Sequence, residues 1–260
     1  MNEMLTASAS TWFLVCAVAF AAGFIDSIVG GGGLVQTPVL LFSFPNTPVA
    51  NLLGTTKIPS FCGTSIAAYH YSKRVQMQWR LITFIALAAF AAALFGSHLV
   101  TLVHNQVLKP IILVVLIAVA IYTYTRKDLG LVKTTEGPVE HALAKGIISG
   151  LLLGCYDGFI GPGTGSFLVL VFIALLNEDF LHANAHAKFI NMATNLASIL
   201  YFSMSGHIFY RLAIPMAICN MVGGYSGSKL ALLKGNRFIR IFFLTIVCAI
   251  IARFAYDILG

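Results

Sequence analysis

The sequence predicts an all-α integral membrane protein built from two repeats in inverted topology. Three observations lead to this fold class. Hydrophobic residues make up 58% of the 260-residue chain and charged residues only 10%, whereas a soluble domain carries about 25% charged residues. A shift of 131 residues aligns the two halves without a gap. Lysines and arginines are also distributed in opposite ways among the corresponding loops of the two halves.

The composition and the missing motifs exclude several classes of function. The net charge of +7 could indicate nucleic-acid binding, but the basic residues lie in short loops between apolar segments, where they orient a membrane protein. The five cysteines are scattered without a CxxC pair, which argues against a disulfide framework or a zinc site. There is no P-loop, complete GxGxxG, GxSxG or HExxH motif. We therefore expect no nucleic-acid partner, no metal, no cofactor and no enzymatic activity.

The apolar segments define the domain organisation, because a helix needs about 20 residues to span a bilayer. The polar stretch 126–145 is expected to be a cytoplasmic linker between a first transmembrane repeat, 1–125, and a second, 146–260. The apolar segments are 11–44, 49–71, 81–103, 108–125, 146–177, 183–206, 212–233 and 238–257.

One stretch is repeated most distinctly, an apolar run with an aspartate followed by a glycine cluster. It reads GFIDSIVGGGGLVQTPVLL at 23–41 and GCYDGFIGPGTGSFLVLVF at 154–172. Acidic residues and helix-breaking glycines are both costly in a membrane segment, so their double occurrence indicates a functional centre. The shift of 131 also aligns Asp26 with Asp157, Lys57 with Lys188 and Arg80 with Arg211, and we expect the two arginines to be interfacial anchors.

The loop charges predict how the halves are oriented. The loop 71–80 holds three basic residues and its counterpart 203–211 holds one, whereas 98–109 holds one and 229–240 holds four. Because Lys and Arg accumulate on the cytoplasmic side, corresponding loops are expected on opposite sides, as in inverted-repeat transporters. This topology places 71–80, 126–145, 178–187 and 229–240 inside and both termini outside.

Inversion requires the first segment of each half to return to the side from which it started. The 34 residues of 11–44 are too few for two full spans of about 20 residues. We expect a glycine-broken re-entrant hairpin of two half-helices followed by three transmembrane helices, although two short tilted spans would give the same parity. The second half-helix is expected to begin near Gln36 in the first repeat and at Thr164 or Ser166 in the second.

The glycine turns predict an anion site. Irregular backbone at membrane depth survives only inside protein or beside a water-filled cavity, and a helix N-terminus offers unpaired N–H groups to an anion. Close helix packing is the alternative role for glycine, and we expect it for Gly150, Gly154, Gly223 and Gly227. The expected substrate contacts are Gly30, Gly31, Gly32, Gly33 and Gln36 in the first repeat and Gly161, Gly163, Thr164, Gly165 and Ser166 in the second.

Two lysines within apolar helices form the second element of the expected site. Lys57, Ser60 and Thr64 are spaced i, i+3, i+7 and share one helix face, and Lys188, Asn191 and Asn195 repeat that spacing. A lysine inside a span usually faces a cavity or a partner. We expect both lysines to hold the substrate or a counter-ion, with the neutral residues adding hydrogen bonds. Snorkelling to the interface is the alternative, more credible for Lys188.

The aspartates are the third element, one helical turn before each glycine turn. Asp26 and Asp157 could carry coupling protons, because burial raises the pKa of a carboxyl group. They could equally be static partners of the lysines or caps for half-helix amides, and the sequence leaves both interpretations open. For His186, close to Lys188, we expect a loop position rather than a proton relay.

These motifs give the chain a resemblance to the TauE/SafE family of bacterial membrane proteins. The first glycine motif, the GTTK of the following helix and the GFIGPGTGSFLVL echo carry the resemblance, which covers nearly the whole chain. It implies an inner-membrane protein of duplicated four-segment halves that exports sulfite, sulfoacetate or related organosulfur anions, with proton coupling. It carries the glycine motif onto Gly30 to Gly33 and Gly161 to Gly165, and the helix lysine onto Lys57. The second half departs from this pattern at Pro162 and Thr164.

The sequence thus predicts a secondary transporter, and more specifically an exporter, of a small anion such as sulfite or an organosulfonate, coupled to protons. The alternatives are an uncoupled anion channel, an importer of a sulfur oxyanion, and a membrane scaffold or sensor without flux. We expect the protein to lie in the lipid bilayer of the bacterial inner membrane. Small-xxx-small pairs are compatible with a homodimer, and equally with packing inside one protomer.

Overall fold

A computed structural model describes residues 8–104, 106–108, 111, 114 and 141–259. Every regular element in these ranges is a helix. The first half contains α2 (Ala9–Val29), α3 (Gly32–Ser43), α4 (Val49–Ser72) and α5 (Trp79–Leu102), and the second contains α7 (Ala142–Phe159), α8 (Thr164–Leu176), α9 (Phe180–Met204) and α10 (Tyr210–Leu259). The expected segment 108–125 and the linker 126–145 lie largely outside the described residues.

The helix starts follow the repeat seen in the sequence. A shift of 131 residues carries Val49, where α4 begins, onto Phe180, where α9 begins. It likewise carries Trp79, the start of α5, onto Tyr210, the start of α10. At Gly235 the backbone of α10 has φ 69° and ψ −166°, which is not helical, so this element consists of two helices joined at that glycine. The same local sequence has therefore produced the same local structure twice.

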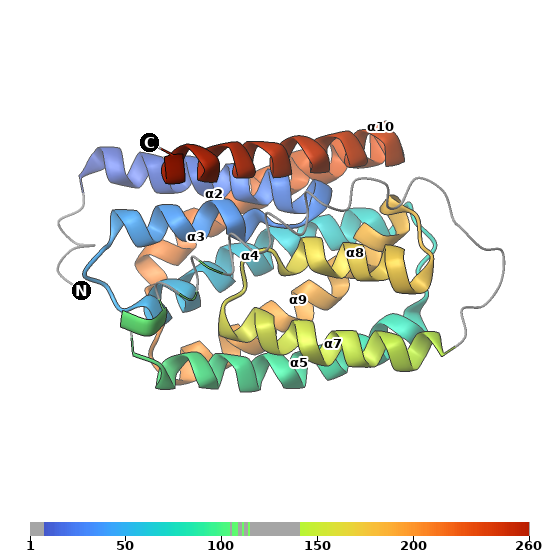
Figure 1. Ribbon diagram of the computed structural model, residues 1–260, viewed down its shortest axis with the longest axis horizontal. Helices are drawn as coiled ribbons and strands as arrows, with labels where there is room; N and C mark the ends of the chain where they lie inside the picture. Colours follow the sequence, from blue (N-terminus) through green and yellow to red (C-terminus); the bar gives the residue numbers. More distant parts are fainter. Residues whose placement is uncertain (1–7, 105, 109–110, 112–113, 115–140, 260) are drawn as a thin grey trace.

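The two halves interlock instead of standing side by side. Helix α2 packs against α10, and its counterpart α7 packs against α5, so the first arm of each hairpin lies against a helix of the other half. Figure 1 shows these two pairs on opposite sides of the molecule, with α4 and α9 between them. Helix α4 also contacts α9 and α10, and α9 contacts α5. The pattern of contacts is thus preserved when the halves are exchanged.

Glycines allow the interlocking helices to approach closely, as predicted for 150, 154, 223 and 227. A Cβ atom at Gly154 would lie 2.3 Å from the carbonyl oxygen of Ala89 on α5, and one at Gly223 would lie 2.1 Å from that of Phe20 on α2. Gly150 and Gly227 meet α5 and α2 in the same way. Small residues let helix backbones touch where apolar burial alone gives little drive for association in lipid.

The hairpins differ in one respect from the expected pair of half-helices. Only the second arms are short, with 12 residues in α3 and 13 in α8, whereas α2 has 21 and α7 has 18. Among the described helices, α2, α5 and α7 are each long and apolar enough to cross a bilayer. The first arms are longer than the expected half-helices because α2 begins at Ala9 and α7 at Ala142, before the starts of the apolar segments 11–44 and 146–177.

Candidate functional site

A small cavity lies where the tips of the two hairpins meet. Its volume is about 40 Å³, which exceeds the roughly 10–15 Å³ that one water requires. It is bounded by the starts of α3 and α8, by α4 and α9, and by a single asparagine from α10. The lining residues are Ala22, Asp26, Gly31, Gly32, Gly33, Gln36, Thr37, Thr56, Lys57, Ser60, Asp157, Ile160, Gly161, Pro162, Gly163, Thr164, Gly165, Asn191, Asn195 and Asn220.

Most of the residues selected from the sequence border this cavity, although they come from six helices. The four that do not line it are Gly30, Thr64, Ser166 and Lys188. Gly30 and Ser166 form the contact between the tips. A Cβ atom at Gly30 would lie 2.3 Å from the carbonyl carbon of Gly165 and equally close to the backbone nitrogen of Ser166. The Ser166 hydroxyl donates to the carbonyl oxygen of Val29 at 3.2 Å.

The glycines break both hairpins by adopting positive φ. Gly30 has φ 75° and ψ 176°, and Gly31 is left-handed at 85° and 13°; Gly161 and Gly163 have φ near 88°. Left-handed geometry costs other L-residues about 1–2 kcal/mol. Helix α8 begins at Thr164, as expected. Helix α3 begins at Gly32 and not near Gln36, because the chain re-enters helical geometry directly after two positive-φ glycines.

Each lysine forms an ion pair with the aspartate of the opposite half. Lys57 Nζ on α4 lies 3.1 Å from Asp157 Oδ2 on α7, and Lys188 Nζ on α9 lies 3.1 Å from Asp26 Oδ2 on α2. Thr64 adds a hydrogen bond from its hydroxyl to Asp26 Oδ2 at 3.2 Å. Lys188 is fully buried, so the snorkelling interpretation is wrong for it. Burying these charges is costly unless they are paired, and the crossed pairs supply the partners.

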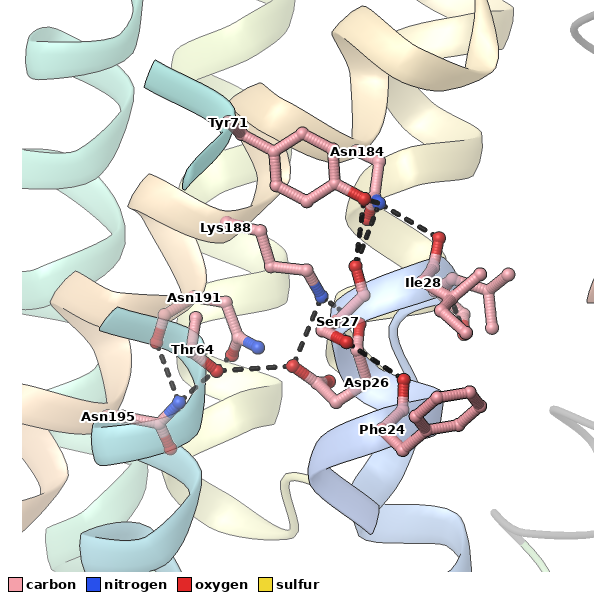
Figure 2. Close-up of polar contacts among 12 residues, drawn as sticks. Phe24, Asp26, Ser27, Ile28, Thr64, Tyr71, Asn184, Lys188, Asn191 and Asn195 are labelled. Atoms are coloured by element: carbon pink, nitrogen blue, oxygen red, sulfur yellow. Dashed lines mark hydrogen bonds and ion pairs between the residues drawn. The ribbon is translucent and has the colours of Figure 1, made fainter. Parts of the chain in front are cut away.

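The lysines also cap the broken helices. The last carbonyls of a helix have no partner within it, and α2 ends deep in the protein. Its Ser27 carbonyl accepts from the Tyr71 hydroxyl and from Asn184 Nδ2, and its Ile28 carbonyl accepts from Asn184 Nδ2, as Figure 2 shows. The Val29 carbonyl accepts from the Ser166 hydroxyl. Lys188 Nζ adds a second bond to the Asp26 carbonyl, which already accepts from the Gly30 N–H.

Helix α7 ends in a similar way. The Asp157 carbonyl accepts from Lys57 Nζ at 2.6 Å, and the Gly158 carbonyl accepts from the Ser97 hydroxyl at 3.3 Å. A cation near a helix C-terminus is also favoured by the helix dipole. Pairing with the aspartates was one of the roles that the sequence left open, and the structure shows that contact for both lysines.

Sequence reasoning missed Asn220, the polar residue that α10 contributes to the cavity. It fits there because Gly23 and Gly63 leave room: a Cβ atom at Gly63 would lie 1.9 Å from Asn220 Oδ1. The shift of 131 places Ala89 at the equivalent position, so the repeat gave no signal for it. A lone asparagine within an apolar helix was the signal available.

Gln36 has an unused hydrogen-bond donor at the cavity. The side chain is 1% exposed, its Oε1 accepts from Asn220 Nδ2 at 3.4 Å, and its Nε2 has no protein partner. An unpaired buried donor costs about 1–3 kcal/mol. An oxygen atom of a solute or a water in the cavity would satisfy it.

His186 is not in a loop, and this prediction was wrong. It lies inside α9 and is completely buried, with Nδ1 2.7 and 2.8 Å from the two carboxylate oxygens of Glu178. Its Nε2 accepts from the Gln78 backbone N–H at 3.4 Å. The equivalent Thr55 accepts from the Phe209 backbone N–H at 3.1 Å in the same way. The segment is polar enough to suggest a loop because the Glu178 and His186 side chains bond to each other inside the protein.

Comparison with known proteins agrees with the motifs. The family profile described as "Sulfite exporter TauE/SafE" matches residues 15–254. A probable membrane transporter protein, ORF9 of Sinorhizobium sp., is 33% identical over 92% of this chain and 90% of its own length. The probable membrane transporter protein YfcA of Escherichia coli K12 is 34% identical over 92% and 88%. One from Haemophilus influenzae is 32% identical over 92% of both chains. No solved structure matches.

Proposed function

Because the chain belongs to the TauE/SafE family of membrane transporters, we propose that it is a secondary transporter that exports a small sulfur oxyanion, sulfite or an organosulfonate, and that this export is coupled to protons. The proposal includes an inverted orientation of the two repeats in the inner membrane, with both termini outside. The interlocked, exchange-symmetric helix contacts support this orientation, since inverted repeats usually build such transporters around a central site.

The observation that carries the proposal is the cavity at the hairpin tips. The starts of α3 and α8 both border it, and so does Lys57. Helix N-termini and a buried ammonium group attract anions, and the Gln36 amide and the asparagines can donate hydrogen bonds. At about 40 Å³ the cavity suits a compact oxyanion better than a long organic chain.

The ion pairs provide a route to proton coupling. In the structure Asp157 neutralises Lys57. An anion that binds Lys57 takes over this neutralising role and leaves Asp157 as a buried, uncompensated carboxylate. Such a group lowers its free energy by binding a proton. One anion and one proton would therefore occupy the site together, which couples their movements.

Anion flux into proteoliposomes tests the proposal. Lys57→Ala and Lys188→Ala are expected to abolish sulfite-dependent uptake, and Lys145→Ala, an exposed cation in the first turn of α7, serves as the matched control. Wild-type rates in both site variants would refute the role of the lysines. Flux that ignores an imposed pH gradient would indicate the uncoupled channel.

A thermal-shift screen separates a transporter from a scaffold. Sulfite is expected to stabilise the detergent-solubilised protein more than sulfate, thiosulfate or taurine, because a ligand that binds the folded state raises its stability. A membrane scaffold or sensor without an anion site predicts no stabilisation by any of the four.

A further inference from the structure

A second, larger pocket lies at the end of α4, away from the hairpin tips. Its volume is about 500 Å³, and it is bounded by the C-terminal turn of α4, the start of α9 and the middle of α10. We call it the α4–α10 pocket. The lining residues are His70, Lys73, Arg74, Leu181, Tyr225, Lys229, Leu232 and Leu233. It shares no residue with the central cavity, so it is not part of the proposed transport site.

The pocket is strongly basic and contains no acid. Lys73, Arg74 and Lys229 all line it, and within the described part of the chain none of them forms an ion pair. The lysine ammonium groups lie over aromatic rings instead, with Lys73 Nζ 4.6 Å from the centre of the Tyr69 ring and Lys229 Nζ 5.8 Å from that of Tyr225. Three cations gathered without a carboxylate repel one another, and a bound anion would relieve that repulsion.

Apart from His70, the remaining walls are apolar, and part of them faces outward. Leu233 is 74% exposed and Tyr225 is 48% exposed, and Leu181 and Leu232 complete the apolar side. In a protein that spans a bilayer, such outward apolar side chains meet acyl chains. The ligand that matches both the basic side and the apolar side of this pocket is amphipathic, with a negatively charged head and a hydrocarbon tail.

From this lining we infer that the α4–α10 pocket binds an anionic phospholipid, with its phosphate among Lys73, Arg74 and Lys229 and its acyl chains along Leu232 and Leu233. Basic pockets between helices on the cytoplasmic side are a known way of holding anionic head groups. The two loops whose charges place them on that side, 71–80 and 229–240, both contribute to this pocket.

The bound lipid would tie together helices from both halves. Arg74 lies two residues after the end of α4, Leu181 lies in the first turn of α9, and Lys229 and Leu232 belong to α10. The same corner is held by the Leu181 backbone N–H, which donates to Asn236 Oδ1 at 2.7 Å just beyond the Gly235 break. A lipid here would stabilise the junction at which the two halves interlock.

Lipid-dependent thermal stability tests this inference. The purified protein is melted in mixed micelles that contain either phosphatidylglycerol or phosphatidylcholine, as the wild type, as Arg74→Gln/Lys229→Gln, and as Lys145→Gln. The double variant removes two pocket cations, and the control removes an exposed cation outside the pocket. Phosphatidylglycerol is expected to raise the Tm of the wild type and of the control, and the double variant is expected to lose about half of that shift or more.

Several outcomes would overturn the inference. If phosphatidylglycerol raised the Tm of the wild type and of the double variant equally, the pocket would not be the site where the lipid binds. An equal effect of phosphatidylcholine would reduce the contact to nonspecific solvation by lipid. A comparable shift with inorganic phosphate or glycerol 1-phosphate would assign the pocket to a soluble anion. Should the double variant fail to fold, native mass spectrometry of the wild type decides, because retention of phosphatidylcholine as readily as phosphatidylglycerol would refute the proposal.

Discussion

The crossed ion pairs lead to a quantitative prediction about stability. Lys57→Met and Asp157→Asn each remove one charge of a pair whose atoms lie 3.1 Å apart, with side-chain exposures of 6% and 4%. At an effective dielectric constant of about 20, that separation corresponds to an attraction of about 5 kcal/mol. Each single substitution leaves a buried charge without its partner, which typically costs about 3–5 kcal/mol.

The double variant Lys57→Met/Asp157→Asn should behave differently from the sum of the single variants. Replacing both members of a buried pair is often close to neutral, so the double-mutant cycle should give a coupling of about 3 kcal/mol or more. The assay is reversible unfolding in mixed SDS micelles, followed by tryptophan fluorescence. Lys188→Met/Asp26→Asn provides the comparison, and it should show weaker coupling because the Asp26 side chain is 17% exposed.

Additive single effects would refute this reasoning. If the coupling energy from the cycle is below about 0.5 kcal/mol, as it is for distant, independent sites, the two groups do not depend on each other in the folded protein. A double variant as unstable as both single variants together would have the same meaning. The carbonyl-capping bonds of the lysines would then be their main contribution to folding.

Three further predictions concern the His186–Glu178 pair, the Asp179 cap and two glycines with positive φ. His186→Ala should destabilise the protein by about 3–5 kcal/mol because it strands buried Glu178, and replacing both residues by threonine, as at the equivalent positions of the first half, should restore most of the loss in the same unfolding assay. Asp179→Ala should cost about 1 kcal/mol because Asp179 caps α9. Burial raises the pKa of the Asp179 carboxyl group, but hydrogen bonds from His182 and the backbone outweigh burial and hold the pKa at about 2. The contribution of this cap to stability should therefore be full above about pH 4 and lost as the pH falls towards 2. Gly206→Ala, with positive φ in open space, should cost about 1–2 kcal/mol, whereas Gly30→Ala, which would clash with the opposite hairpin tip, should lower the Tm much further; similar shifts would contradict the close contact.

Much of the fold could be predicted from the sequence because the same pattern of residues occurs in both halves of the chain. The glycines, the aspartates and the lysines recur at one spacing, and the starts of α4 and α9 follow it to the residue. Local signals of this kind, helix breakers and residues costly in lipid, act within a few residues of where they occur. The positions of the helix ends and of the costly polar residues can therefore be predicted from the sequence alone.

The partners of those residues could not be read in the same way. Lys57 could have paired with either aspartate, because Asp26 and Asp157 have equivalent sequence surroundings. The choice depends on how the halves interlock, which is a long-range property. The repeat also concealed the features that break it: Asn220 and Gln36, which meet across the cavity, stand opposite Ala89 and Phe167 in the alignment of the halves.

That asymmetry bears on how the two lysines divide their roles. The sequence posed substrate binding and counter-ion pairing as alternatives, but for Lys57 they are compatible, since it contacts Asp157 and also borders the cavity. Lys188 is buried against Asp26 and does not reach the cavity. Measurements of stability and of transport should therefore distinguish the roles of Lys57 and Lys188. A Lys57→Met/Asp157→Asn protein that folds like the wild type but is no longer stabilised by sulfite would assign the ammonium group to the solute, because the substitution removes its ion pair with Asp157 as well and the proposed proton site at Asp157 does not itself hold the anion.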